Sequence, residues 1–171
     1  MKRLAAPLLL LLSLALSGCG LKPLYAGGSG GAVAHTLGTV EVAPIEGKAG
    51  WLVRNAINDR LGASPKGTAV YRLEIELDDQ ISSFGIRTDD AVTRERRTLR
   101  ARYRLIEAGK GTVVLDATAG SDAGIDIVSS EYATIAAENT ALENLSQVVA
   151  DQIVSRVALF AQRSAGQDEG Q

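Results

Sequence analysis

Cysteine, histidine and aromatic residues are scarce in this 171-residue chain, which has one cysteine, one histidine and 4% aromatic residues. A single cysteine excludes a disulfide within the chain. One cysteine and one histidine also fall short of the ligand set of a structural or catalytic zinc site. His35 follows a glycine-rich stretch, which is a poor place for a positioned catalytic base. We therefore predict a protein that is not an enzyme and that uses no cofactor or metal.

The chain also lacks an excess of positive charge, since its formal net charge is −2. A slightly acidic chain is a poor general binder of polyanions, so we expect no nucleic-acid partner. Against this background, residues 94–104 (RERRTLRARYR) contain six of the eighteen basic residues within eleven positions. Such a cluster either binds a polyanion or forms the solvated face of a strand.

The amino terminus carries the long apolar run of the chain, at residues 4–16, directly after a lysine and an arginine. This run is shorter than the roughly 20 apolar residues that a transmembrane helix needs. A basic start, a short apolar stretch and small residues at its end are typical of a secretory signal peptide. We predict that residues 1–18 are this signal peptide and are removed.

The sequence Leu-Ser-Gly that ends the signal is followed by Cys19, and the four residues resemble the lipobox of bacterial lipoproteins. We therefore predict that Cys19 is the lipid attachment site. Several acyl chains anchor a protein stably, because each buried CH₂ contributes about 0.8 kcal/mol and one chain alone is marginal. Gly20, in place of the aspartate that marks retention in the inner membrane, favours the periplasmic side of the outer membrane.

Composition divides the remaining chain into three parts. Residues 19–34 form the lipidated amino terminus and, through their Gly- and Ser-rich end, a flexible tether. Residues 35–160 are expected to form one domain, and 161–171 a polar, disordered tail.

Hydrophobic periodicity predicts six elements in the domain. Alternating apolar residues indicate strands at 37–45, 69–77, 98–106 and 112–128. Apolar residues at helical spacing indicate helices at 51–62 and 131–160, the latter capped by Ser129 or Ser130. The order β-α-β-β-β-α predicts an α+β two-layer sandwich, with two helices on one face of a four-stranded sheet.

The second and third strands predict an antiparallel hairpin in which the numbers of opposed residues sum to 178. The apolar and the charged side chains then match together: Leu73 with Leu105, Ile75 with Tyr103, Glu74 with Arg104, Glu76 with Arg102, and Asp78 with Arg100. A slip of one residue would exchange the two faces and ruin both sets. Arg100, Arg102 and Arg104 are therefore expected on a solvated sheet face, paired with acidic residues.

Four further arginines lie toward the expected hairpin tip, namely Arg87, Arg94, Arg96 and Arg97. One hypothesis is that they bind an amphiphile with phosphate head groups, because the guanidinium fork makes bidentate bonds to phosphate and because Phe84 and Ile86 lie beside them. The alternative is local pairing with Asp89, Asp90 and Glu95. The sequence alone leaves both open.

Three segments in their order along the chain resemble the LptE family of lipopolysaccharide-assembly lipoproteins, in a form like that of alphaproteobacteria. They are GCGLKPLY (18–25), the strand pair YRLEIEL and RARYRL, and SSEYATIAAENTALENL (129–145). The resemblance implies two helices on a four-stranded sheet and no enzymatic activity. It further implies a plug inside the outer-membrane β-barrel LptD, with lipopolysaccharide as the second partner.

Family members are thought to contact lipopolysaccharide through basic residues at the hairpin tip and near the start of the last helix. At the tip, Arg87 is the nearest match, with Arg94, Arg96 and Arg97 beside it. Near the last helix the chain instead offers Glu131, Thr134 and Glu138, with no basic residue. The alternative to a plug is a lipoprotein that binds or carries an amphiphile by itself for a lipid transporter.

Overall fold

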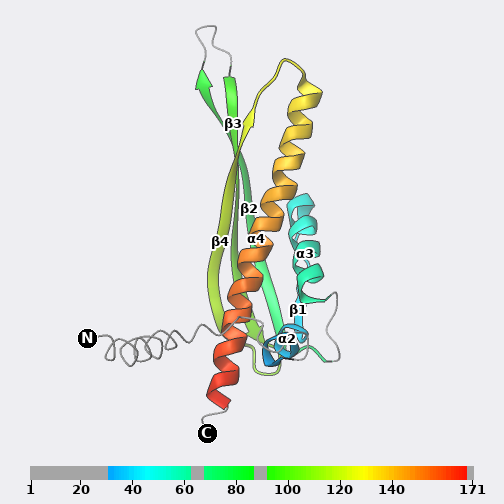
Figure 1. The fold of residues 1–171 in the computed structure, drawn as a ribbon, viewed down its shortest axis with the longest axis vertical. Helices are drawn as coiled ribbons and strands as arrows, with labels where there is room; N and C mark the ends of the chain where they lie inside the picture. Colours follow the sequence, from blue (N-terminus) through cyan, green and yellow to red (C-terminus); the bar gives the residue numbers. More distant parts are fainter. Residues whose placement is uncertain (1–30, 63–67, 87–91, 169–171) are drawn as a thin grey trace, which may run out of the picture.

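A four-stranded sheet with helices packed on one of its faces forms the molecule (Figure 1). The structure is a computed structural model and describes residues 31–62, 68–86 and 92–168. Cys19 and Arg87 lie outside these residues. The elements follow in this order: α2 (Ala32–Leu37), β1 (Val40–Val42), α3 (Gly47–Leu61), β2 (Tyr71–Ile86), β3 (Val92–Glu107), β4 (Thr112–Asp126) and α4 (Glu131–Asp168).

The strands lie in the order β1-β2-β3-β4. The short β1 is parallel to β2 at residues 71–73, and α3 forms the crossover between them. The other neighbours are antiparallel. The predicted register is confirmed, since Leu73 lies opposite Leu105 and Glu74 opposite Arg104. A slip of one residue would have placed the apolar and the charged sets on the wrong faces.

Strands β2 and β3 are longer than the apolar alternation indicated. Pairing continues through Ser82 and Arg96 to Ile86 and Val92. Apart from Ile81, the distal segments DDQISS and TRERR are polar on both faces, so they lack the period-two pattern on which strand prediction depends. Backbone hydrogen bonding extends the ladder regardless of that pattern.

Helices α3 and α4 supply the second layer of the sandwich. Val53 and Ile57 of α3 are fully buried, as are the side chains of α4 along a stripe that includes Leu142, Val149 and Ile153. They enclose the core with the inward row of β3, which comprises Leu99, Ala101, Tyr103 and Leu105. The predicted α+β class with helices on one face is confirmed.

The apolar stripe of α4 is uncovered at its amino-terminal end. Ile135 lies seven residues before the buried Leu142, on the same side of the helix, yet it is 48% exposed. Lys48, in the first turn of α3, donates a hydrogen bond to Asn139 at 2.6 Å, so α3 begins beside Asn139. The two turns of α4 that precede Asn139 therefore extend past the start of α3.

Local chemistry explains where two helices begin or end. Ser130 accepts a hydrogen bond at its Oγ from the backbone N–H of Ala133 at 3.4 Å, so Ser130 caps α4 as expected. Gly62 ends α3 with φ of 90°, a left-handed conformation that favours glycine.

Both ends of the described chain are more ordered than the composition suggested. Helix α2 begins inside the segment expected to be a tether, because Val33 and Leu37 sit one turn apart and are buried in the core. Helix α4 runs to Asp168, through residues expected to form a tail, and Ala161 is fully buried. A helix that already packs along the core needs few further apolar contacts to continue.

Candidate functional site

The sheet face opposite the helices, here called the open face, carries most of the arginine cluster. The even-numbered arginines of β3 point to it, because the odd-numbered residues of the same strand face the helices. Their side chains are between 42% and 64% exposed, and they are Arg94, Arg96, Arg100, Arg102 and Arg104.

Carboxylates of both neighbouring strands flank this row of arginines. On the β2 side, Arg104 lies 3.3 Å from Glu74 and 3.7 Å from Glu76. On the β4 side, Arg102 lies 3.0 Å from Asp116. Arg102 thus forms its ion pair with Asp116 and not with Glu76, although Glu76 is the residue directly opposite, as predicted.

The ion pairs of β4 were missed by the sequence reasoning, which considered only β2 as the acidic partner. Register places Asp116, Asp122 and Asp126 on the open face, beside the arginines of β3. With Arg72 of β2, the open face holds six arginines and seven carboxylates among its described residues, and the remaining carboxylates are Glu41 of β1, opposite Arg72, and Glu74, Glu76 and Asp78 of β2. We call this set the open-face lattice.

The pKa values of Arg102 and Asp116 show that this ion pair of the lattice remains charged. The hydrogen bonds from Arg102 lower the pKa of the Asp116 carboxyl below its ordinary value, and the same bonds raise the pKa of Arg102. Both groups stay ionised at neutral pH. With six arginines and seven carboxylates, the charges of the lattice are nearly balanced, which agrees with the interpretation of Arg100, Arg102 and Arg104 as a paired, solvated face.

Arg94 and Arg96 lie at the distal end of the open face, nearest the hairpin tip. Arg94 pairs with Asp126 at 2.8 Å, and Arg96 lies 3.9 Å from Asp122. The guanidinium of Arg96 also sits 5.3 Å from the centre of the Phe84 ring, within the range of a cation–π contact. Phe84 itself is 40% exposed. Charged and apolar surface therefore meet at this end of the face.

Arg97 points the other way, toward the helices, and its side chain is 11% exposed. Its Nε and Nη2 donate to the two carboxylate oxygens of Asp79 at 2.8 and 2.6 Å, and its Nη1 donates to the carbonyl of Glu138 at 3.0 Å. The Asp79 hydrogen bonds raise the pKa of Arg97. The structure thus separates Arg97 from Arg94 and Arg96, with which the sequence grouped it. The alternation of side chains along the strand could have indicated this difference, since Arg97 lies two residues before the buried Leu99 and therefore points to the same face.

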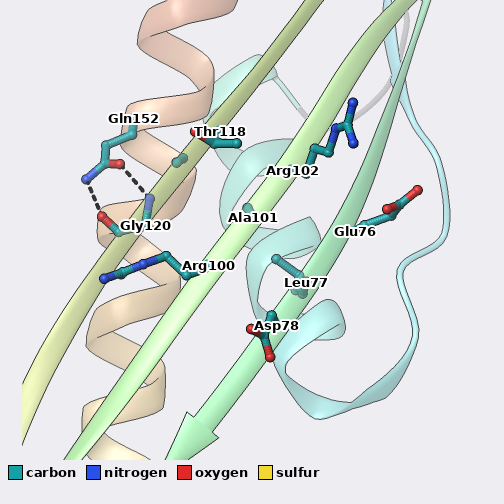
Figure 2. Close-up of a pocket in the computed structure, with 10 residues that line it drawn as sticks. Glu76, Leu77, Asp78, Arg100, Ala101, Arg102, Thr118, Gly120 and Gln152 are labelled. Carbon is teal, nitrogen blue, oxygen red and sulfur yellow. Dashed lines mark hydrogen bonds between the residues drawn. The ribbon is translucent and has the colours of Figure 1, made fainter.

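A shallow groove of about 650 Å³ crosses the middle of the open face (Figure 2). Its polar lining includes Glu76, Asp78, Arg100, Arg102, Thr118 and Gln152. Arg100 lies across Gly120, where a Cβ atom would stand 2.5 Å from the Arg100 Cδ. Gly120 therefore permits this close approach. Groups of both charge signs line the groove, which makes it a surface for polar contacts.

Gln152 of α4 closes the edge of β4 at the same position. Its amide accepts from the Gly120 N–H at 3.0 Å and donates to the Gly120 carbonyl at 3.3 Å, as a neighbouring strand would (Figure 2). The sequence reasoning missed both residues. Gln152 and Gly120 lie 32 positions apart, and nothing in the pattern of either segment indicates this contact.

Neither a candidate metal site nor a membrane-spanning helix is found in the part of the chain that the structure describes. Within it, no three His, Cys, Asp or Glu side chains are grouped so that they could hold a metal ion. The helices in the same ranges are too short or too polar to cross a membrane. His35 lies exposed on α2.

Comparison with solved structures shows the same fold in bacterial lipoproteins. A candidate lipoprotein of Caulobacter crescentus CB15 is 25% identical, with a TM-score of 0.66 over 78% of this chain and 98% of the other. A minor lipoprotein of Acinetobacter baumannii is 11% identical (TM-score 0.58; 71% and 91% covered). The rare lipoprotein B of Shewanella oneidensis is 10% identical (TM-score 0.52; 77% and 98% covered).

No curated protein sequence matches the chain. A family model described as "LptE: Lipopolysaccharide-assembly" matches residues 37–157, which span the domain from the end of α2 into the last third of α4. The match includes the hairpin, the open face and the Arg97 contacts. The chain therefore belongs to the LptE family, a non-enzymatic family of lipopolysaccharide-assembly lipoproteins.

Proposed function

We propose that this protein is an outer-membrane lipoprotein that occupies the lumen of the LptD barrel and helps it to assemble lipopolysaccharide. In this proposal Cys19 carries the lipid anchor, and the protein faces the periplasm. The open-face lattice is the observation that carries the proposal. A face that is polar, exposed and nearly charge-balanced suits contact with the hydrophilic interior of a barrel, whereas an apolar or strongly cationic face does not.

The test is the composition of the purified complex. The full-length chain is tagged at its carboxyl terminus, extracted in mild detergent and purified under native conditions. We expect a stoichiometric barrel protein of far greater mass to accompany it. Recovery of the chain alone with bound lipid would contradict the plug and support the alternative of a lipoprotein that carries an amphiphile by itself.

We propose further that Arg94 and Arg96, together with Arg87 beyond the described hairpin, contact the phosphates of lipopolysaccharide. Arg94 and Arg96 keep more than half of their side-chain surface exposed. The nearest carboxylate of Arg96 lies at 3.9 Å, too far for a hydrogen bond, so its donors remain accessible. Phe84 supports the amphiphile hypothesis, since it offers exposed apolar surface beside the Arg96 guanidinium.

The double substitution Arg94→Gln/Arg96→Gln tests this contact. A charge-assisted hydrogen bond contributes roughly 1.5–3 kcal/mol, so we expect binding of purified lipopolysaccharide to weaken at least tenfold. The matched control is Arg102→Gln/Arg104→Gln, which removes the same charge from the same strand and face, farther from the tip. An equal loss in both double variants would point to general electrostatics and would contradict a site at the distal end.

A further inference from the structure

We propose that Arg97 is a positioning residue that fixes the hairpin against α4 and thereby orients Arg94 and Arg96 for lipopolysaccharide. The inference rests on the proposed function of Arg94 and Arg96. We call the contact of the Asp79 carboxylate, the Arg97 guanidinium and the Glu138 carbonyl the Arg97 bridge. It joins three elements, because these groups belong to β2, β3 and α4 in turn.

The geometry of the bridge holds the guanidinium in one orientation. Three of its donor nitrogens are engaged, two by Asp79 and one by Glu138. The planar fork fixes all its donors together, so the carboxylate and the carbonyl must keep their relative positions. A lysine at this site could keep the charge but could not bond both groups in the same way.

The place of the bridge in the fold explains why the hairpin needs it. Strand β1 pairs with β2 only at residues 71–73, and β4 ends at Asp126, opposite Arg94. Past that point the hairpin continues as two strands to Ile86 and Val92 (Figure 1). A two-stranded ribbon is marginally stable by itself. Its direction therefore depends on how firmly its base is attached.

Arg97 lies at this base, one residue from Arg96 and three from Arg94. The bridge attaches the helix-facing side of β3 to α4 at Glu138, seven residues after the helix begins. On the open face, the Arg94–Asp126 pair attaches the same stretch of β3 to the end of β4. The stretch is thus held on both faces, and Arg94 and Arg96 project from a backbone of fixed direction.

The burial of the Arg97 side chain indicates that it does not contact the ligand directly. Its side chain is 11% exposed and points away from the face that carries Arg94 and Arg96. An anion that reached it would have to compete with Asp79. Arg97 therefore acts through its neighbours.

The experiment compares Arg97→Lys and Asp79→Asn with the control Arg100→Lys, which makes the same change at an exposed position of the same strand. Hydrogen exchange of the full-length chain in detergent reports the bridge without any ligand. We expect exchange to accelerate about tenfold in the hairpin and in the first two turns of α4 for both bridge variants, and to stay unchanged in the control. Thermal melting of each variant confirms that it is folded. Unchanged exchange in both bridge variants would overturn the inference.

Binding of purified lipopolysaccharide is the second measurement. We expect Arg97→Lys to weaken it about tenfold in the natural background and to have no further effect when Arg94→Gln/Arg96→Gln is present, because Arg97 acts through those two residues. Additive losses, or faster exchange with unchanged binding, would show that the bridge serves stability alone and would overturn the positioning role. If Arg94→Gln/Arg96→Gln itself binds normally, the proposed lipopolysaccharide contact fails, while the exchange data still decide the bridge.

Discussion

An odd or even position along β3 decides which face of the sheet each arginine occupies, because successive side chains of a strand point to opposite faces. Arg96 and Arg97 are neighbours in the chain, yet one is 56% exposed beside Phe84 and the other is 11% exposed against Asp79 and α4. Distance from the hairpin tip, which the sequence suggested as the dividing variable, does not separate them. Identical residue types in one short segment can therefore have different roles.

The two open-face glycines of β4 provide a prediction at this scale. Gly120→Val should destabilise the protein relative to Gly124→Val by about 1–2 kcal/mol, because a Cβ at 120 meets the Arg100 side chain at 2.5 Å and the Leu99 carbonyl at 3.0 Å, whereas a Cβ at 124 meets nothing within 4 Å. Urea denaturation of both variants measures the difference. Equal stabilities would mean that Arg100 does not lie across Gly120.

Ion-pair coupling is a second test at the residue scale. Double-mutant cycles should give a larger coupling for Arg102 with Asp116, at 3.0 Å, than for Arg102 with Glu76, which lies opposite but forms no ion pair with it. Both couplings should shrink with added salt, since these groups are exposed. A larger coupling to Glu76 would contradict the observed rotamer of Arg102.

The elements are joined by a small number of polar contacts in addition to the apolar core. Arg60 near the end of α3 pairs with Asp151 of α4, and Lys48 at the other end of α3 bonds Asn139. Gln152 attaches α4 to the edge of β4, and Arg97 attaches it to the hairpin. Helix α4 thus contacts α3, the edge of β4 and the hairpin through polar groups, in addition to its apolar packing on the core.

The Arg60–Asp151 pair makes stability depend on pH in the acid range. The Arg60 hydrogen bond lowers the pKa of Asp151 below its ordinary value of about 3.8. A lowered folded-state pKa contributes stability that is present above the unfolded value and is lost as pH falls through the folded value. We expect Asp151→Asn to be less stable than the natural chain above about pH 5 and the difference to shrink as pH falls below about 3.8, through the lowered folded-state pKa.

Urea denaturation at a series of pH values measures this difference. Arg60→Gln is the control, because loss of the cation should abolish the same pH-dependent contribution. A stability difference that persists unchanged in acid would assign the effect of Asp151→Asn to packing and not to the ion pair.

At the scale of the whole molecule, the hairpin and the first described residues lie at opposite ends. Helix α2 and the carboxyl end of α4 occupy one end, and the distal parts of β2 and β3 the other (Figure 1). The arginines of the hairpin therefore lie at the end of the domain opposite α2, the first described helix.

The anchor itself gives a prediction. Cys19→Ala should leave the chain unacylated, because no other thiol exists in the sequence. Mass spectrometry of the purified protein should find acylated Cys19 as the amino terminus of the natural chain. A natural chain with an unmodified terminus, or with a terminus at another residue, would contradict the predicted lipobox.

The sequence by itself determined the layers, the order of the main elements and the register of the hairpin. Local side-chain periodicity and charge alternation carry that information, and a slip of register would reverse faces that differ strongly in polarity. It also placed Arg100, Arg102 and Arg104 on a paired face. These properties depend on residues that are near in sequence or directly opposed within one hairpin.

The tertiary structure alone decided most of the partners that the arginines take, although the Arg104–Glu74 pair is one that the sequence predicted. The carboxylates of β4 lie 14 or more positions from the arginines with which they pair, and the Glu138 carbonyl lies 41 positions from Arg97. The sequence pattern of β3 does not record these contacts. The same holds for Val33 and Leu37 of the short helix α2 and for Ala161 in the last turns of α4, which are ordered because the core lies beside them. A polar side chain can bond any nearby group, so its partner follows from the packing of the whole chain.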